Sequence, residues 1–178
     1  SLTRTSAEKI AWPIIKKIVA KFKISCKLRE ARLEVVMKNG ATLTLYGADR
    51  IDFHDRLYGQ KFGGVWVDEA AFFNTDLRYL VIDVLEPALF DYGGQLTLMS
   101  KPGLVKKGYF WDIVSGKEVD WSVRKWSWEQ NKAMADTTRD RIAGKVKRDP
   151  SYLSMPEVRR NWFNEWADEV GTLVYKKF

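Results

Sequence analysis

The chain has 178 residues, of which 46% are hydrophobic, 30% charged and 13% aromatic, and its net charge is +7. This length and apolar content favour one folded domain with a true core and exclude an intrinsically disordered chain. The single cysteine, Cys26, excludes an internal disulfide framework and favours a reducing compartment. With only one histidine, His54, the chain also lacks the usual ligands of a structural zinc site. No apolar run approaches the roughly 20 residues that cross a bilayer, so no membrane partner is expected.

The N-terminal segment predicts an amphipathic helix. Apolar residues recur three and four positions apart through residues 7–22, and lysines fill the positions between them. Thr5 and Glu8 have the spacing of a capping box, which places the start of the helix there. Pro13 lies inside the pattern and predicts a kink or a late helix start.

A β-hairpin is predicted next. Apolar residues alternate over residues 33–37 and return over residues 42–46, on either side of Asn39 and Gly40, and glycine tolerates the positive φ of a tight turn. A loop rich in glycine, aspartate and arginine follows over residues 47–64. Residues 65–67 then form an apolar run that predicts a buried strand, with Trp66 in the core.

The remaining segments alternate between helix and strand. The predicted elements are a helix over residues 76–90 capped by Asn74 or Thr75, a strand over residues 95–100, a short helix or turn over residues 109–116, and a weak strand over residues 121–128. The last fifty residues are polar and predict one helix over residues 157–166, with Ser154 as its cap and Gly171 beyond its end, and then the start of a strand over residues 171–178. Strands that alternate with helices indicate an α/β domain with a mostly parallel sheet.

Two adjacent carboxylates, Asp68 and Glu69, follow the predicted strand at residues 65–67 directly. In open α/β folds, ligands bind beyond the carboxyl ends of the strands. A pair of acids there suits phosphate hydrolysis, in which the first acid holds Mg²⁺ through water and the second polarises the attacking water. Adjacent residues leave a strand in opposite directions, so the second acid can act only if the chain turns at this point. The small pairs at residues 63–64 and 70–71 are expected to leave room for that turn. The alternative is that the acids cap a helix.

The motif order resembles that of large terminase subunits of tailed bacteriophages, the motors that pump DNA into capsids. The resemblance rests on "LTRTSAEKIAW", on "GADRIDFHDRLYGQKFGGVWVDEAAFF", on "LTLMSKPG" with "GYFWDI", and on the closing "NWFNEWADEVGTLVYKKF". It covers nearly the whole chain and is sharpest over residues 47–73. By this resemblance Asp68 is the Walker B acid that binds Mg²⁺, Glu69 is the catalytic glutamate, and Ser100 belongs to the coupling motif that links hydrolysis to movement.

The family commonly places an arginine directly before a glycine in the loop that precedes Walker B, where it serves a neighbouring subunit's nucleotide as a finger. In this chain Tyr58 occupies the position before Gly59, and Arg56 lies two residues earlier, with Arg50 further back. The resemblance therefore makes Arg56 the candidate finger. The alternative for both arginines is a solvated loop.

A P-loop of the form G-x-x-x-x-G-K-[ST] does not occur in the 178 residues. The nearest spacing joins Gly103 to Gly108, but Tyr109 follows where lysine is required. In terminases the P-loop precedes the segment with which this chain begins, and a nuclease domain follows the segment with which it ends. We therefore expect the middle and end of an ATPase domain, which by itself binds ATP weakly or not at all.

Basic residues supply candidate DNA contacts. Lys101, Lys106 and Lys107 lie in the loop after Ser100, and cations of this kind neutralise phosphates without reading sequence. Among the tryptophans, Trp126 and Trp128 either pack under a lid or stack on a base, and packing is the favoured interpretation.

The resemblance implies a RecA-like P-loop NTPase core over residues 1–125, with a mostly parallel sheet that is incomplete at the N-terminus, and a lid-like subdomain over residues 126–178. It implies an ATPase motor that uses ATP and Mg²⁺ to translocate double-stranded DNA, as a homo-oligomeric ring, with portal protein and small terminase subunit as partners. Its setting would be the cytoplasm of the infected bacterial host, and transiently the viral procapsid. The alternative is a non-catalytic DNA-binding or assembly module that keeps a degenerate NTPase fold.

Overall fold

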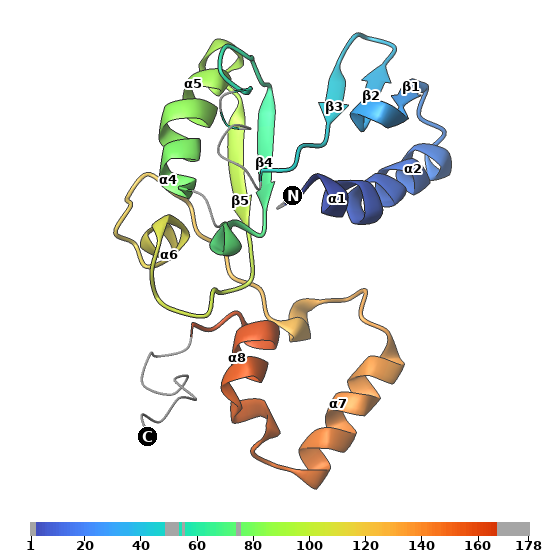
Figure 1. The fold of residues 1–178 in the computed structure, drawn as a ribbon. Helices are drawn as coiled ribbons and strands as arrows, with labels where there is room; N and C mark the ends of the chain where they lie inside the picture. Colours follow the sequence, from blue (N-terminus) through green and yellow to red (C-terminus); the bar gives the residue numbers. More distant parts are fainter. Residues whose placement is uncertain (1–2, 49–53, 55, 74–75, 167–178) are drawn as a thin grey trace. The chain divides into compact units, whose positions relative to one another are not determined.

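The computed structural model describes residues 3–48, 54, 56–73 and 76–166, and the chain divides into two compact units, residues 1–99 and 100–178 (Figure 1). Within these described ranges, no helix is both long enough and apolar enough to cross a bilayer. The strands form two separate sheets, an antiparallel trio and a parallel pair.

The predicted N-terminal helix is present as three consecutive segments: α1 (Arg4–Ser6), the π-helical η1 (Ala7–Ala11) and α2 (Trp12–Lys21). The expected capping box of Thr5 and Glu8 is wrong, because the cap is Thr3, whose Oγ1 accepts a hydrogen bond from the Ser6 backbone nitrogen at 2.9 Å. The π segment ends two residues before Pro13, whose ring and missing N–H would interrupt a regular α-helix, so the change from π to α geometry falls where the proline disturbs the hydrogen bonds.

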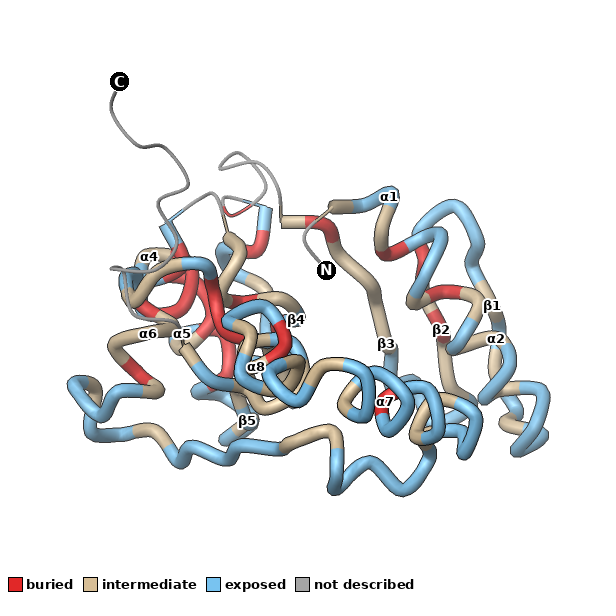
Figure 2. The backbone as a smooth tube through the Cα atoms, turned by 90° about the horizontal axis from the view of Figure 1, so that it is seen from below, coloured by how far each residue is buried: buried red, intermediate tan, exposed pale blue. Residues whose placement is uncertain are grey.

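The predicted hairpin is confirmed and belongs to a three-stranded antiparallel sheet. It consists of β2 (Glu34–Met37) and β3 (Thr42–Thr44), and Gly40 adopts a φ of +85° in the turn between them. An unpredicted strand, β1 (Cys26–Arg29), pairs with the other edge of β2, and the short 3-10 helix η2 (Glu30–Arg32) joins the two. This sheet packs on the N-terminal helix through buried side chains, namely Ala7, Trp12, Leu33 and Val35. Figure 2 colours buried positions red along the backbone.

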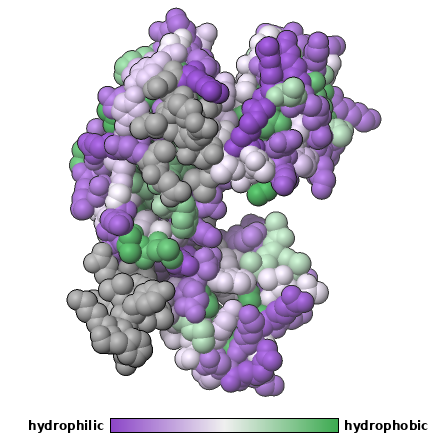
Figure 3. Space-filling model, viewed as in Figure 1, coloured by the Kyte–Doolittle hydropathy of each residue, from purple (hydrophilic) through white to green (hydrophobic). Residues whose placement is uncertain are grey.

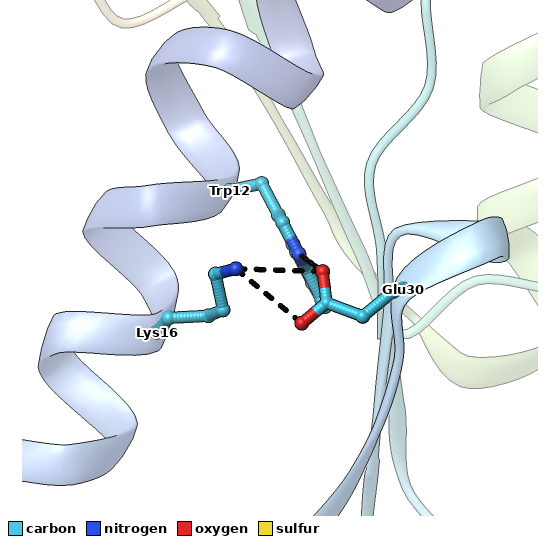
Figure 4. A network of polar contacts seen from close by, with 3 residues as sticks. All are labelled: Trp12, Lys16 and Glu30. Carbon is cyan, nitrogen blue, oxygen red and sulfur yellow. Dashed lines mark hydrogen bonds and ion pairs between the residues drawn. The ribbon is translucent and has the colours of Figure 1, made fainter.

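A polar contact also ties α2 to this sheet. The Trp12 indole N–H donates to Glu30 at 2.5 Å, and the Lys16 ammonium lies 3.3 Å from the same carboxylate (Figure 4). The hydrogen bond from Trp12, assisted by Lys16, lowers the pKa of Glu30 from its ordinary value of 4.5.

The second sheet holds β4 (Gly64–Asp68) and β5 (Gln95–Met99), which are parallel and in register from Gly64 with Gln95 to Asp68 with Met99. The predicted strands on both sides of the central helix are therefore confirmed. The crossover consists of η3 (Ala70–Phe72), α4 (Leu77–Tyr79), the π-helical η4 (Leu80–Leu85), α5 (Glu86–Leu89) and η5 (Phe90–Tyr92).

The crossover helix begins after Asp76, whose side chain accepts from the Tyr79 backbone nitrogen at 3.1 Å. The expected caps, Asn74 and Thr75, lie outside the described residues. The helix buries an apolar face toward the parallel sheet, made of Leu77, Leu80, Val81, Val84, Leu85, Ala88 and Leu89.

The prediction that Trp66 is buried is wrong. Its side chain is 61% exposed, whereas its neighbour Val67 is 6% exposed. Side chains alternate across a strand, so Trp66 points away from the face that buries Val67. Gly64 lies on the Trp66 side, and a Cβ there would stand 3.1 Å from the indole, so this glycine makes room for the ring rather than for a turn at the acids.

The second unit contains α6 (Tyr109–Val114), η6 (Trp128–Gln130), α7 (Asp136–Arg148), η7 (Tyr152–Ser154) and α8 (Pro156–Phe163). The short helix α6 was predicted, whereas α7 was not. The predicted strand over residues 121–128 is wrong, because residues 121–127 have no regular structure and η6 begins at Trp128.

Helix α8 confirms the last predicted helix but not its ends. Its N-cap is Met155 rather than Ser154, and the helix stops before Asn164, which adopts a φ of +53°. Gly171 and the predicted strand over residues 171–178 lie outside the described residues.

Candidate active site at the end of strand β4

Asp68 is the last residue of β4 and stands opposite Met99 at the carboxyl end of the parallel pair. It is exposed to solvent. In a parallel sheet this is the edge at which ligands are bound. Asp68 therefore offers a carboxylate at the position where the sequence placed a metal-binding acid.

The chain turns directly after Asp68, which is the condition for the second acid to act, and the turn is made by Glu69. This residue has φ 57° and ψ 38°, the left-handed conformation, and its carbonyl accepts from the Phe72 backbone nitrogen at 2.9 Å to close η3. Ala70 follows and is 1% exposed. A glutamate in this conformation is strained, and strain of this kind concentrates at functional sites.

The Glu69 carboxylate has an unusual environment. Its Oε2 atom is buried and accepts no hydrogen bond from the described residues. Buried side-chain oxygens are nearly always hydrogen-bonded, so one that is not calls for an explanation. A water or a ligand group that donates to this oxygen would satisfy it.

Ser100 shares this property. It follows Met99 directly along the chain and is the first residue of the second unit. Its Oγ is buried and has no hydrogen-bond partner within the part of the chain that the structure describes.

Arg56 lies on a loop that is anchored on both sides. Its neighbour Leu57 is 5% exposed, and the Leu57 backbone nitrogen donates to the carbonyl of the fully buried His54 at 3.0 Å. The Tyr58 hydroxyl lies 2.7 Å from the Tyr79 hydroxyl on α4. The Arg56 side chain itself is exposed.

Two further contacts hold this loop. The Gln60 amide donates to the Arg56 carbonyl at 2.7 Å. Lys61 pairs with Asp91, and the hydrogen bond to that carboxylate raises the pKa of Lys61 above its ordinary value of 10.5. Arg50, the other arginine considered for a finger, lies outside the described residues.

The described residues contain no group of three or more histidine, cysteine, aspartate or glutamate side chains that could hold a metal ion. Such a cluster is not needed for Mg²⁺, which keeps several waters and binds proteins through one or two carboxylates and the phosphates of a substrate. The exposed carboxylate of Asp68 fits that limited requirement.

The three candidate DNA lysines lie in the second unit and differ in their surroundings. The Lys106 ammonium stands 5.8 Å from the centre of the Trp111 ring, a cation–π contact. Lys101 and Lys107 are exposed.

Hydrophilic residues cover much of the surface seen in Figure 3, as expected for a chain that is 30% charged.

The sequence prediction missed a groove of about 900 Å³ in the second unit. Trp126 and Trp128 both line it, together with Trp162. The favoured interpretation, that Trp126 and Trp128 pack, applies to Trp128, whereas Trp126 is 62% exposed. The contact of Trp128 with Trp162 on α8 could not be predicted, because the spacing of Trp126 and Trp128 indicates a strand and does not encode a contact with a distant segment.

Comparisons of the chain with protein-family models, with curated proteins and with solved structures found no match. The functional interpretation therefore depends on the residues themselves.

Proposed function

We propose that this chain contains the catalytic part of the ATPase motor of a viral DNA-packaging terminase, which hydrolyses ATP with Mg²⁺ to translocate double-stranded DNA into a capsid. The observation that carries the proposal is the environment of Glu69, which follows exposed Asp68 at the end of a parallel strand. Glu69 has a left-handed backbone conformation, and no described residue donates a hydrogen bond to its buried Oε2.

The two acids have separate roles in this proposal. Asp68 holds the hydrated Mg²⁺, which when bound neutralises charge on the phosphates. Glu69 accepts a hydrogen bond from the attacking water at its unsatisfied oxygen and takes the proton as general base. The turn at Glu69 brings the second carboxylate out of the alternating pattern of the strand, which a regular extension of β4 would not do.

The remaining residues serve the motor around this chemistry. Ser100, with its buried hydroxyl, takes the place of the coupling residue after the neighbouring strand. Arg56 is the candidate finger toward a neighbouring subunit of a homo-oligomeric ring, since its loop is anchored while its side chain is exposed. Lys101, Lys106 and Lys107 supply charge toward the DNA backbone. The partners are portal protein and small terminase subunit, in the cytoplasm of an infected bacterium and on the procapsid.

The test is ATP hydrolysis by a protein that joins this chain to a P-loop, because none of the 178 residues forms that motif. Glu69→Gln is expected to lower turnover by about 10²- to 10⁴-fold, the usual effect of losing a general base, and to leave ATP affinity unchanged. Glu69→Ala should do the same. Asp83→Asn, which removes an exposed acid from the crossover helix, is the matched control and should keep full turnover. If the Glu69 variants retain turnover, the general-base role is wrong.

The absence of a P-loop from these residues favours a second candidate, a non-catalytic DNA-binding or assembly module with an NTPase-like fold. The two candidates differ in what precedes Ser1. A P-loop encoded within about 60 residues upstream, the reach of two βαβ units, favours the motor. A titration of the chain by itself with ATP should show no affinity in the micromolar range under either candidate, and such affinity would contradict both.

A further inference from the structure

We propose that the groove in the second unit binds single-stranded nucleic acid, with the Trp126 indole as a platform on which an unpaired base stacks. The groove is lined by three tryptophans, by side-chain amides and by a lysine; the residues used here are Trp126, Trp128, Trp162, Gln130, Asn131 and Lys101. All belong to residues 100–178, so the inference does not depend on the proposed ATPase function.

The aromatic floor of the groove is made of packed rings. The Trp128 ring meets the Trp162 ring edge to face, with centroids 5.9 Å apart and an interplanar angle of 81°. It also meets Phe163 at 6.4 Å and 88°. These contacts join η6 to α8 and stabilise the aromatic floor of the groove.

Trp126 is exposed although its backbone is fixed. The Asn164 side-chain amide donates to the Trp126 carbonyl, and the next residue, Ser127, donates its backbone N–H to the Gln130 side chain at 2.9 Å. The indole nevertheless stays 62% exposed. The backbone that carries the indole is therefore held in place, so a ligand that stacks on Trp126 has only the side chain left to order.

The polar lining suits the edges of bases. Gln130, Asn131, Asn161 and Asn164 border the same groove and carry amides, which can both donate and accept hydrogen bonds. An aliphatic ligand would leave these groups without partners, whereas a nucleobase presents donors and acceptors around an aromatic face. Aromatic side chains on which bases stack are typical of proteins that bind single strands.

The charge around the groove selects the occupant. Lys101 lines it, and none of the other residues that line it is charged. The lining therefore carries a net positive charge, which attracts a phosphate backbone. A proline-rich peptide, the other usual occupant of an aromatic groove, gains nothing from it. A duplex hides its base faces within its own stack, so the stacking platform requires an unpaired base.

The experiment measures the anisotropy of a fluorescein-labelled twelve-nucleotide oligo(dT) with the full chain at low salt. Saturable binding is expected, and Trp126→Ala should weaken it by about 5- to 150-fold, the effect of losing one stacked base. Trp126→Phe should restore most of the affinity. Trp66→Ala is the matched control, because Trp66 is equally exposed, at 61%, but lies in the first unit. The affinity of this variant for oligo(dT) should equal that of the parent chain.

Two further arms complete the test. Lys101→Gln should lower the slope of log affinity against log salt by about 0.7 for oligo(dT). A hairpin duplex of the same length should bind more weakly than oligo(dT) and should not respond to Trp126→Ala. The proposal is overturned if oligo(dT) does not bind, if Trp126→Ala has no larger effect than Trp66→Ala, or if a ten-residue polyproline peptide binds through Trp126 while oligo(dT) does not.

Discussion

Replacing Glu69 with glycine should stabilise the first unit while it removes the proposed general base. A non-glycine residue in the left-handed conformation is strained by about 1–2 kcal/mol. A buried oxygen without a donor adds about 1–3 kcal/mol, and the greater freedom of glycine in the unfolded chain offsets about 0.4–1 kcal/mol. Glu69→Gly is therefore expected to raise the free energy of unfolding by about 1–5 kcal/mol, the opposite of the usual effect of a substitution.

Lys23 is the matched control for this experiment. It has a φ of 49° at the end of α2, where the Ile24 backbone nitrogen donates to the Val19 carbonyl at 3.0 Å, the arrangement in which glycine is the preferred residue. Lys23 is exposed, so Lys23→Gly relieves backbone strain alone and should gain about 1 kcal/mol or less. The difference between the two variants measures the contribution of the buried carboxylate.

Urea unfolding of the chain gives both free energies, with the slope of each transition checked against the parent. The expected order is Glu69→Gly above Lys23→Gly above the parent chain. If Glu69→Gly destabilises the chain while Lys23→Gly does not, Glu69 makes contacts that stabilise the fold, and the argument that it is retained for chemistry fails. Such a trade of stability for a strained catalytic group is the expected relation at an active site.

Three further predictions concern other parts of the molecule. Trp12→Phe removes the indole donor, so the pKa of Glu30 should rise toward 4.5, as measured by NMR titration. The lowered pKa stabilises the fold at neutral pH, and this stabilisation is lost as the pH falls through the folded-state pKa. The free energy of unfolding of the variant should therefore depend less on pH below pH 4.5 than that of the parent chain. Trp66→Thr should change the free energy of unfolding by less than about 0.5 kcal/mol, whereas Val67→Ala should lower it by about 1–3 kcal/mol. An equal effect of the two substitutions would contradict the exposure of Trp66. Lys107→Gln should lower the salt slope of double-stranded DNA binding by about 0.9 in a filter-binding assay, and an unchanged slope would remove this lysine from the DNA contacts.

The sequence predicted the elements whose pattern is local. The hairpin at Asn39 and Gly40 and the strands β4 and β5 depend on alternation and turn chemistry within a few residues, and both are present. Helix α7 was missed because it buries only Ile142 and so has almost no apolar stripe to detect. The caps at Thr3 and Asp76 were displaced by two or fewer residues from their expected positions, since several polar residues compete at each helix start.

The exposure of Trp66 could not be predicted from its own strand. An apolar run predicts a strand that is covered on both faces, as in a larger parallel sheet. Among the described residues, β4 pairs with β5 alone, and its Val67 side is buried while its Trp66 side is exposed. Whether a side chain of a strand is buried depends on a second layer, and the local sequence of the strand does not encode that layer.

The structure also bears on the alternative that the two acids cap a helix. An acid that caps a helix accepts a backbone N–H of the first turn, as Asp76 does from Tyr79 at the start of α4. Glu69 occupies the corresponding position before η3, but its side chain makes no such hydrogen bond, and no residue that the structure describes donates to its buried Oε2. Capping therefore explains Asp76 and does not explain Glu69. Because a strained backbone and an unsatisfied carboxylate both lower stability, their occurrence in one residue next to an exposed aspartate is better explained by a bound water or ligand than by the fold alone.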